Sequence, residues 1–415
     1  MTEFVVKQLR ELKEMDLIVI LRKIRTAFLR AVESLLMGIS VPFVLIMRAL
    51  RPVILIRFGS LESSRIGHFA INTEVYLSEC DIGMHGTEKT LDVFYHKPPA
   101  CNYQLKRMWD RVLPVRRMAR ILDKTNKLIP GGEEHVIPFR VNACRDIYGV
   151  LPKTQPHIYF TNTEEQKGRD EMLLKLGISE RAPFVCFHAR TGDYLRKVLP
   201  GGDWGYHDYR DSDINNYVMA AEELTNRGYF AVRMGAHVKK KLNTGNRKVI
   251  DYATNERTDF LDMYLSAKCD FFICDTAGIY AVAELFRKPI AWVNYTTFEY
   301  VPSYGKDHLF IPKKLWLAEE HRFLTFREIL ESGVGRYMCT CEYKKDGIEL
   351  IENTPEEIKA LSVEMDERLK GKWYDAKESN ELQDKFWKFF PQNQLNRVIQ
   401  ARIGSEFLFQ NRDLL

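Results

Sequence analysis

Apolar and polar residues change their spacing along the chain, and each change predicts a different kind of element. Residues 1–30 place apolar side chains at helical spacing with basic residues between them. Residues 34–47 follow as an uncharged stretch that contains Pro42, and a proline inside a helix breaks or kinks it. We therefore expect no single straight helix through residues 34–47.

From residue 52 onward, short apolar runs alternate with amphipathic stretches. We expect strands at residues 52–58, 91–95, 136–139, 182–188, 229–234, 248–252, 270–274 and 289–293. We expect helices at residues 69–80, 162–176, 213–227, 259–267 and 278–286, an amphipathic segment interrupted by Pro114 at residues 104–123, and a helix that opens at Thr354. This alternation is typical of an α/β fold with parallel sheets.

Two alternating blocks of similar size predict a GT-B-like architecture, in which two Rossmann-like domains face each other across a cleft. We expect basic amphipathic helices over residues 1–50, a first Rossmann-like domain over residues 51–175, a second over residues 176–340 and a helical tail over residues 341–415. The tail is rich in aromatic residues, so we expect it to pack rather than to extend into solvent.

The composition excludes several classes of protein. A chain of 415 residues with 45% hydrophobic and 28% charged residues is neither disordered nor a polytopic membrane protein. The net charge of +5 is too small to indicate nucleic acid as a partner, although it suits an anionic ligand or surface. The 8 cysteines are scattered, which predicts free thiols in a reducing cytoplasm. Cys339 and Cys341 are too close for a zinc knuckle and have no partner pair.

The most informative string is FVCFHARTGD, residues 184–193. It places His188, Arg190 and Asp193 where a buried strand leaves its sheet, and ligands of open α/β sheets bind just beyond such ends. An arginine there matches a phosphate and would stabilise a departing diphosphate. A structural ion pair between Arg190 and Asp193 is the alternative, and the residues leave both interpretations open.

A second candidate lies at CDTAG, residues 274–278, where a strand runs into a helix. The N-terminus of a helix presents unpaired backbone N–H groups, so this turn favours the binding of phosphate. Asp275 and Thr276 are also ordinary N-capping residues, and capping is compatible with a bound nucleotide.

A third candidate is the glycine-flanked loop that contains Arg65 and His68. Histidine titrates in the range that a base for an acceptor hydroxyl needs, so His68 is a candidate catalytic base. Asp193, His207 and Asp208 are rival bases, and packing or capping is the structural alternative for His68.

Five strings taken together closely resemble the glycosyltransferases found with bacterial surface-polysaccharide gene clusters. They are RIGH (65–68), HARTGD (188–193), HDYRDSD (207–213), VRMG (232–235) and CDTAG (274–278). This resemblance covers residues 52–415. More distantly, the H-x-R-x-x-D string is similar to the nucleotide-site motif of the fucosyltransferase superfamily, which has the GT-B fold. Those enzymes usually carry paired arginines in that motif, whereas Thr191 stands at the second position here, which puts GDP-fucose in doubt as the donor.

The resemblance implies an inverting, metal-independent glycosyltransferase that requires no cofactor. Its donor would be a nucleotide sugar and its acceptor a surface glycan or a lipid-linked glycan. We expect catalytic roles for Arg190, at the diphosphate, and for His68 or Asp193, at the acceptor. We expect nucleotide-sugar binding by His188, Arg190, Arg233, Gly235, Asp275, Thr276, Ala277 and Gly278, and the resemblance implies that Thr276 and the residues after it contact the phosphates. The Asp211-Ser212-Asp213 string resembles a metal-binding D-x-D, but it precedes a predicted helix, so we favour capping.

Two alternative functions stay open at the level of sequence. One is a sugar-nucleotide epimerase of the same fold, and the other is a non-catalytic nucleotide-sugar-binding scaffold of a polysaccharide complex. For residues 1–50 we expect a peripheral anchor at the anionic cytoplasmic face of a membrane, with packing or dimerisation as the alternative.

Overall fold

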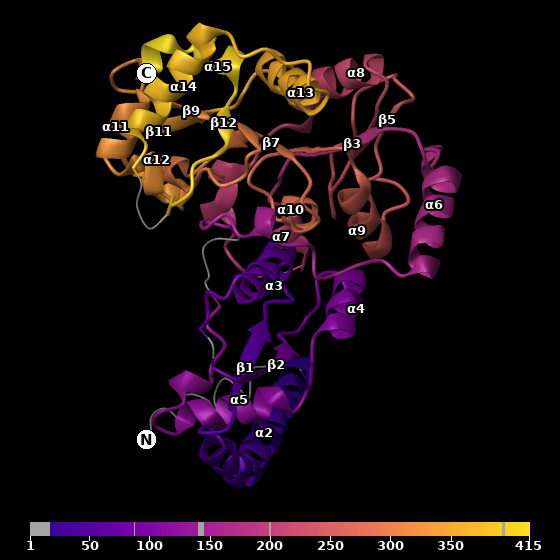
Figure 1. Ribbon diagram of the computed structural model, residues 1–415, viewed down its shortest axis with the longest axis vertical. Helices are drawn as coiled ribbons and strands as arrows, with labels where there is room; N and C mark the ends of the chain where they lie inside the picture. The colour runs from indigo at the N-terminus through magenta and orange to yellow at the C-terminus, as the bar shows by residue number, and fades with distance from the viewer. Residues whose placement is uncertain (1–16, 87, 140–144, 199–200, 392–394) are drawn as a thin grey trace. The chain divides into compact units, whose positions relative to one another are not determined.

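The computed structural model describes residues 17–86, 88–139, 145–198, 201–391 and 395–415 (Figure 1). The helix expected over residues 1–30 therefore lies partly outside the described residues. The chain forms two compact units, each built from separate segments. The first unit contains Met1–Leu61, Gly86–Lys97 and Leu113–Pro138, and the second contains Glu62–His85, Pro98–Val112 and Phe139–Leu415.

The first unit is built on two parallel strands. Strand β1 (Leu55–Leu61) pairs with β2 (Thr90–His96), and single parallel bridges join Phe58 to Val136 and Phe94 to Val115. The long helix α2 (Leu17–Ala49), α5 (Ala119–Leu128) and the short 3-10 helix η1 (Glu133–His135) complete the unit. Its core contains Val44, Met47, Phe58, Tyr95 and Ala119. The predicted strands at 52–58 and 91–95 are confirmed, whereas residues 136–139 contribute one bridge.

Helix α2 runs without a break through Pro42, so the predicted interruption is wrong. Contacts with α5 hold the helix on both sides of the proline. The Ser40 and Thr125 hydroxyls lie 2.6 Å apart, and the Arg48 guanidinium donates to the side-chain oxygen of Asn126 (2.8 Å) and to the carbonyl of Ile129 (2.8 Å). This tertiary packing outweighs the one backbone hydrogen bond that a proline removes.

The second unit contains a parallel sheet of seven strands in the order β12-β8-β7-β6-β3-β4-β5. The strands are β3 (Phe184–His188), β4 (Phe230–Arg233), β5 (Val249–Ile250), β6 (Phe272–Cys274), β7 (Ile290–Tyr295), β8 (Leu309–Pro312) and β12 (Arg402–Ile403). Counted from β3 along the chain, the first six strands have the order 3-2-1-4-5-6 of a Rossmann fold. The predicted α/β class is confirmed, and the point where the strand order reverses lies between β3 and β6.

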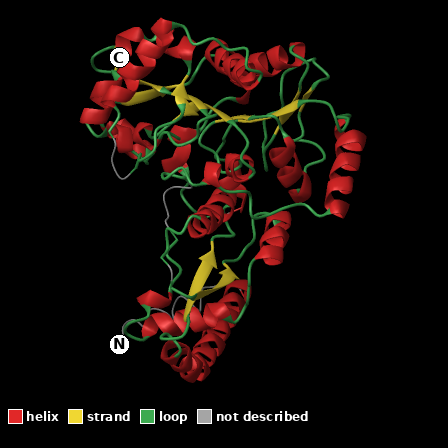
Figure 2. Ribbon diagram, viewed as in Figure 1, coloured by secondary structure: helices red, strands yellow, loops and turns green. Residues whose placement is uncertain are grey.

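Helices cover both faces of this sheet (Figures 1 and 2). Helices α8 (Val218–Asn226) and α13 (Pro355–Leu369) lie on one face, and α9 (Asp259–Lys268) and α10 (Tyr280–Leu285) lie on the other. The remaining helices of the unit are α3 (Ile66–Asp81), α4 (Tyr103–Val112), α6 (Asn162–Leu176), α7 (Asp193–Val198), α11 (Phe326–Glu331), α12 (Thr340–Lys345), α14 (Lys377–Phe389) and α15 (Ser405–Gln410). The expected capping of α13 is confirmed, because Thr354 and Glu357 form a capping box.

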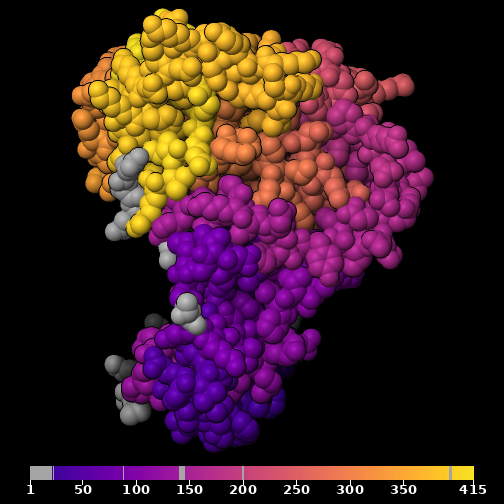
Figure 3. Space-filling view, viewed as in Figure 1, coloured from indigo at the N-terminus to yellow at the C-terminus, as the bar shows by residue number. Residues whose placement is uncertain are grey.

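The C-terminal residues pack within the second unit, as their aromatic content predicts. Strand β12 extends the parallel sheet beside β8, and Phe386 of α14 contacts the rings of Phe298, Phe310 and Phe326. In the space-filling view these residues, coloured yellow, join the surface of the segment that precedes them (Figure 3). A small antiparallel sheet of β9 (Lys314–Leu317), β10 (Arg322–Phe323) and β11 (Ile348–Ile351) was not predicted.

The prediction of free thiols is wrong for one pair of cysteines. Cys339 and Cys341 form a disulfide, and their Cα atoms are 5.1 Å apart, within the range that a disulfide bridges. Cys186 and Cys274 are buried free thiols, as expected for apolar strand positions, and Cys269, directly after α9, is a third.

Candidate functional site

A cavity of about 420 Å³ lies in the second unit at the carboxyl ends of β3 and β6. This is the crevice where the strand order reverses and where open α/β sheets bind their ligands. Residues from all five sequence strings line it, although they are up to 213 positions apart in the chain. The lining includes Arg65, His68, His188, Arg190, His207, Arg210, Gly235, Thr276, Ala277 and Gly278.

The end of β3 positions two of the predicted residues. The Nδ1 of His188 lies 2.8 Å from the carbonyl oxygen of Met234, and because a carbonyl only accepts, Nδ1 carries the proton. Burial lowers the pKa of His188, so the ring is neutral at pH 7 and its Nε2 is an acceptor. Gly235 has a φ of +147°, and a Cβ there would lie 3.2 Å from the His188 ring. The VRMG glycine therefore makes room for this histidine.

Asp275 is fully buried and organises the turn beneath the cavity. Its Oδ2 accepts hydrogen bonds from the backbone N–H of Arg190 (2.7 Å) and from the hydroxyl of Ser212 (2.6 Å). Asp275 thus holds β3, β6 and the 211–213 segment together. It does not line the cavity, and its contact with the Arg190 backbone helps to place that residue at the cavity.

The 3-10 turn η3 (Gly205–Arg210) forms one wall of the cavity. Arg190 donates to the carbonyl oxygen of His207 (3.1 Å) and pairs with Asp211. Arg210 reaches across to Thr276, with its Nε 3.3 Å from the Thr276 hydroxyl. The HARTGD, HDYRDSD and CDTAG strings are therefore one connected structure.

The RIGH string completes the cavity by close packing. A Cβ on Gly278 would lie 3.2 Å from Cγ2 of Ile66 and 3.3 Å from the backbone nitrogen of Gly67, so only glycine lets the two strings touch without displacement. His68 lies in the first turn of α3, with its Nδ1 3.3 Å from the side-chain nitrogen of Asn72. Burial and the charge of Arg65 lower the pKa of His68, which keeps the ring neutral at pH 7.

The cavity carries an excess of positive charge. Five arginines line it: Arg65, Arg145, Arg190, Arg210 and Arg257. Arg190 pairs with Asp211 and Arg257 with Asp262 (2.6 Å). The other three make no ion pair with a carboxylate among the described residues. Burial first, and then the charges of Arg210, Arg190 and Arg65, lower the pKa of His207 to about 4, so this ring is neutral at pH 7.

Three of the predicted site residues do not line this cavity: Asp275, described above, Arg233 and Asp193. Arg233 is buried, where it pairs with Asp251 (3.1 Å) and donates to the carbonyl of Lys240 (2.6 Å). Asp193 pairs with Lys239 (2.8 Å) rather than with Arg190, at the start of α7.

The predicted capping role of the D-x-D string is confirmed for its second residue. Asp213 accepts from the backbone N–H of Asn215 (2.9 Å) and caps the 3-10 turn η4 (Ile214–Tyr217). Asp211 instead accepts from the backbone N–H of Gly192 (2.9 Å) and pairs with Arg190. Among the described residues, no group of three or more His, Cys, Asp and Glu side chains has metal-site geometry.

Sequence reasoning did not single out three of the five arginines. Arg210 lies inside the HDYRDSD string, which also holds the candidate bases His207 and Asp208, so the string itself points to this arginine. Arg145 belongs to no recognisable motif. It lies at the cavity because its guanidinium donates hydrogen bonds to the carbonyl oxygen of Val301 (2.7 Å) and to the side-chain oxygen of Asn396 (2.6 Å). Arg257 lies in the polar loop before α9 and carried no signal either.

No protein-family model matches the chain, and no curated protein matches it. Several solved structures match the chain, all at low similarity. The ADP-heptose LPS heptosyltransferase II of E. coli is 13% identical, with a TM-score of 0.34 over 57% of this chain and 84% of that one. A family 9 glycosyl transferase of Veillonella parvula is 10% identical, with a TM-score of 0.41 over 76% of this chain and 98% of that one. TM-scores this low establish neither activity nor substrate, so function has to be argued from the site.

Proposed function

We propose that the chain is a glycosyltransferase of GT-B type that transfers a sugar from a nucleoside-diphosphate-sugar to a glycan acceptor, without a metal ion. The observation that carries this proposal is the set of three arginines, Arg65, Arg145 and Arg210, that have no carboxylate partner and line a cavity at the switch point of a Rossmann sheet. A diphosphate is the ligand whose charge would compensate them.

In this mechanism the departing nucleoside diphosphate gains negative charge as the bond to the sugar breaks. Guanidinium groups fixed in the cavity stabilise that charge without reorganisation. Arg190 is held by Asp211 and by the backbone contact with Asp275, and Arg210 is held by Thr276, so both are preorganised. Arg233 takes no part in our proposal, because Asp251 already pairs with it.

His68 is the proposed base for the acceptor hydroxyl. It lines the same cavity, and burial and the charge of Arg65 lower its pKa, so the ring is neutral near pH 7 and able to accept a proton. To accept at Nε2, His68 has to carry its proton at Nδ1. A half-turn of the Asn72 side-chain amide places an oxygen beside Nδ1 and supplies that partner.

The test is a panel of nucleotide-sugar donors, with and without glycan acceptors, read by release of free nucleoside diphosphate. Acceptor-dependent release in excess chelator supports the proposal. Release of nucleoside diphosphate with an altered free sugar and no acceptor would favour an epimerase, and saturable donor binding without turnover would favour a scaffold. Loss of activity in chelator that manganese restores would contradict metal independence.

We further propose that the first unit binds an anionic membrane surface. Helix α2 exposes large apolar side chains to solvent, including Leu21, Ile24, Phe28, Leu35, Ile39, Phe43, Leu45 and Ile46. Its segment Lys23–Ala49 is apolar and long enough, at 27 residues, to cross a membrane. The stretches 17–61, 86–97 and 113–138 carry 14 Lys and Arg residues against 6 Asp and Glu residues, a net charge of +8 in a chain of +5. An exposed apolar helix in a basic unit suits an anionic bilayer.

Sedimentation with vesicles tests this second proposal. We expect the full chain to bind anionic vesicles. Replacement of Phe28 and Leu35 by glutamate should abolish this binding without unfolding the protein, because these side chains are 67% and 65% exposed. Leu174→Glu is the matched control, since Leu174 is 83% exposed in the second unit. A full-length protein that stays in the supernatant at low salt would contradict the proposal.

A further inference from the structure

A disulfide lies in the wall of a second, open cavity of about 1070 Å³ that adjoins the arginine-lined one. The two cavities share Thr191, Tyr209 and Val238 in their linings. Cys339, Thr340 and Cys341 line the open cavity, and Met338, directly before them, lines the arginine cavity. The disulfide therefore stands at the junction of both cavities.

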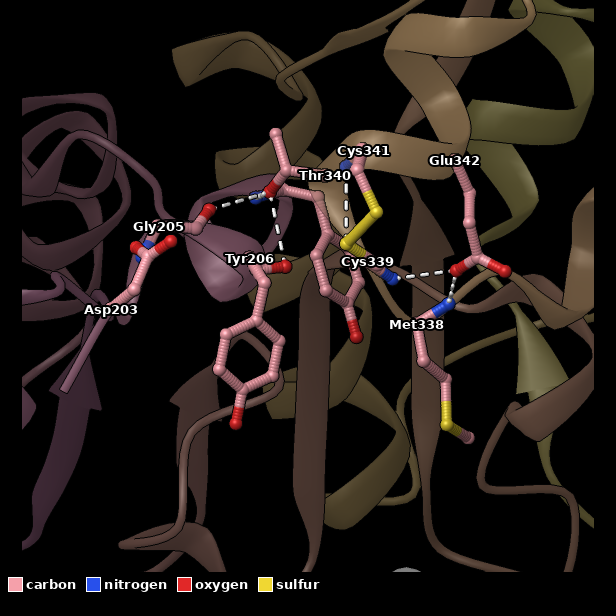
Figure 4. Close-up of a disulfide and its surroundings, with 9 residues drawn as sticks. Asp203, Gly205, Tyr206, Met338, Cys339, Thr340, Cys341 and Glu342 are labelled. Carbon is pink, nitrogen blue, oxygen red and sulfur yellow. Dashed lines mark hydrogen bonds between the residues drawn. A yellow bond between two sulfur atoms is a disulfide. The ribbon is translucent and has the colours of Figure 1, made fainter. Parts of the chain in front are cut away.

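Thr340 lies between the two cysteines, and its side chain is hydrogen-bonded to the turn η3 (Figure 4). The one hydrogen of its hydroxyl lies within reach of the carbonyl oxygens of Gly205 (3.0 Å) and Tyr206 (3.1 Å), and the hydroxyl oxygen accepts from the backbone N–H of Tyr209 (3.0 Å). This turn carries His207, Tyr209 and Arg210 into the arginine cavity. A single side chain thus links the disulfide ring to the wall of the candidate site.

We propose that Cys339 and Cys341 form a reversible redox modification site, and that the disulfide form holds η3 in the arrangement that binds nucleoside diphosphate. The inference rests on the proposed function for its ligand. Closure of the ring across Thr340 restricts the backbone of residues 339–341, and this restriction keeps the Thr340 hydroxyl directed at η3. Reduction removes the restriction, so the hydroxyl and the turn gain freedom and the cavity becomes less preorganised.

The chemistry requires a dithiol reductant and accessible sulfur. Cys341 is exposed, whereas Cys339 is half-buried, so a thiolate of the reductant attacks Sγ of Cys341. The S–S bond breaks, and Cys339 leaves as a thiolate that accepts a hydrogen bond from the backbone N–H of Cys341 (3.2 Å). The second thiol of the reductant then displaces Cys341. The protein gains two electrons and two protons as two thiols, and the reductant becomes a disulfide.

This pair differs from a disulfide that maintains the fold. It spans two residues only, so it constrains little of the unfolded chain. The turn before α12 is also held without it, because the Glu342 carboxylate accepts from the backbone N–H groups of Met338 (2.8 Å) and Cys339 (2.8 Å). Opening the ring therefore leaves the second unit folded while it loosens the contact with η3.

The experiment measures nucleoside diphosphate binding by the full chain before and after treatment with dithiothreitol. We expect reduction to release two thiols and to weaken the binding of ADP, UDP or GDP about three- to tenfold. This factor corresponds to the net contribution of about one hydrogen bond, which here is the bond that orders η3 before the ligand binds. Replacement of both Cys339 and Cys341 by serine should give the weaker binding and no response to dithiothreitol. Thr340→Val, which keeps the disulfide and removes the hydroxyl, should do the same. Cys80→Ser, at an exposed thiol elsewhere, is the control and should keep the full response.

A second readout needs no ligand. Hydrogen exchange at the Tyr209 amide, which donates to Thr340, should be faster in the reduced protein and in Thr340→Val. Equal exchange in both redox forms, or equal affinity with a confirmed change of two thiols, would overturn the redox proposal. If no nucleoside diphosphate binds in either form while exchange at Tyr209 changes, the proposed function fails and the redox coupling to η3 stands.

Discussion

Arg65 offers the sharpest test of the diphosphate site, because its guanidinium has no bonded partner among the described residues. Its replacement by alanine removes no side-chain hydrogen bond or ion pair among the described residues, so we expect the melting temperature to stay within about 1 °C of wild type. A hydrogen bond to a charged group contributes about 1.5–3 kcal/mol. At 1.4 kcal/mol per factor of ten, loss of the contact should weaken diphosphate binding about 10- to 150-fold.

Titration calorimetry with inorganic pyrophosphate and with ADP, UDP and GDP measures this change. Arg65→Lys should recover only part of the affinity, because lysine keeps the charge and lacks the planar fork. Arg181→Ala is the matched control, since Arg181 is exposed, lies outside the cavity and makes no side-chain contact among the described residues. Arg190→Ala is a less clean variant, because it also leaves Asp211 without its cation.

Two results would refute the reasoning about Arg65. If Arg65→Ala binds pyrophosphate within a factor of two of wild type, the guanidinium does not contact the ligand. If the variant loses stability together with affinity, Arg65 supports the fold instead, and the loss of binding says nothing about phosphate recognition.

Three further predictions concern the same unit. Gly278→Ala places a Cβ 3.2 Å from Ile66, so we expect a loss of about 1–3 kcal/mol in unfolding free energy and weaker nucleotide binding. Gly245→Ala, where the added Cβ meets open space, is the control and should change neither quantity. His68→Gln should lower kcat about 10²- to 10⁴-fold with little change in donor KM, and an unchanged pH–rate profile would exclude His68 as the base. Burial lowers the pKa of His308 to about 4 from its ordinary value near 6.5, so the unfolded chain binds the extra proton and stability falls by about 3 kcal/mol as pH drops from 6.5 to 4. In His308→Asn, the unfolding free energy should change less between pH 6.5 and 4. An unaltered slope of unfolding free energy against pH would contradict the assignment to His308.

The sequence predicts the second unit well because its signals are local. Each strand from β3 to β7 is a short apolar run, and each run ends at a polar string that the fold brings to the same edge of the sheet. The nucleotide-site candidates at residues 188–193 and 275–278 follow from this rule alone. The strand order explains why the rule works here, since β3 and β6 are neighbours at the switch point.

What the sequence does not predict depends on contacts between distant segments. Arg145 enters the cavity through hydrogen bonds to Val301 and Asn396, which are far away in the chain, and no local pattern predicts it. The continuity of α2 through Pro42 depends on α5, which lies 85 positions away at the Ser40–Thr125 contact. The Cys339–Cys341 disulfide contradicts the expected free thiols, because two cysteines at a sequence separation of 2 match no zinc-site spacing and carry no local signal of pairing.

The division of the chain into units also changes how the RIGH string is understood. Sequence blocks place residues 65–68 in the first Rossmann-like domain, whereas the structure places Glu62–His85 in the second unit, against CDTAG. Every residue that lines the arginine cavity then belongs to one compact unit. The groups proposed to hold the diphosphate and the base proposed to activate the acceptor are consequently positioned by one sheet and its helices. Their relative geometry is preorganised by packing such as that of Gly278 on Ile66, which is the condition for stabilising charge that develops only in the transition state.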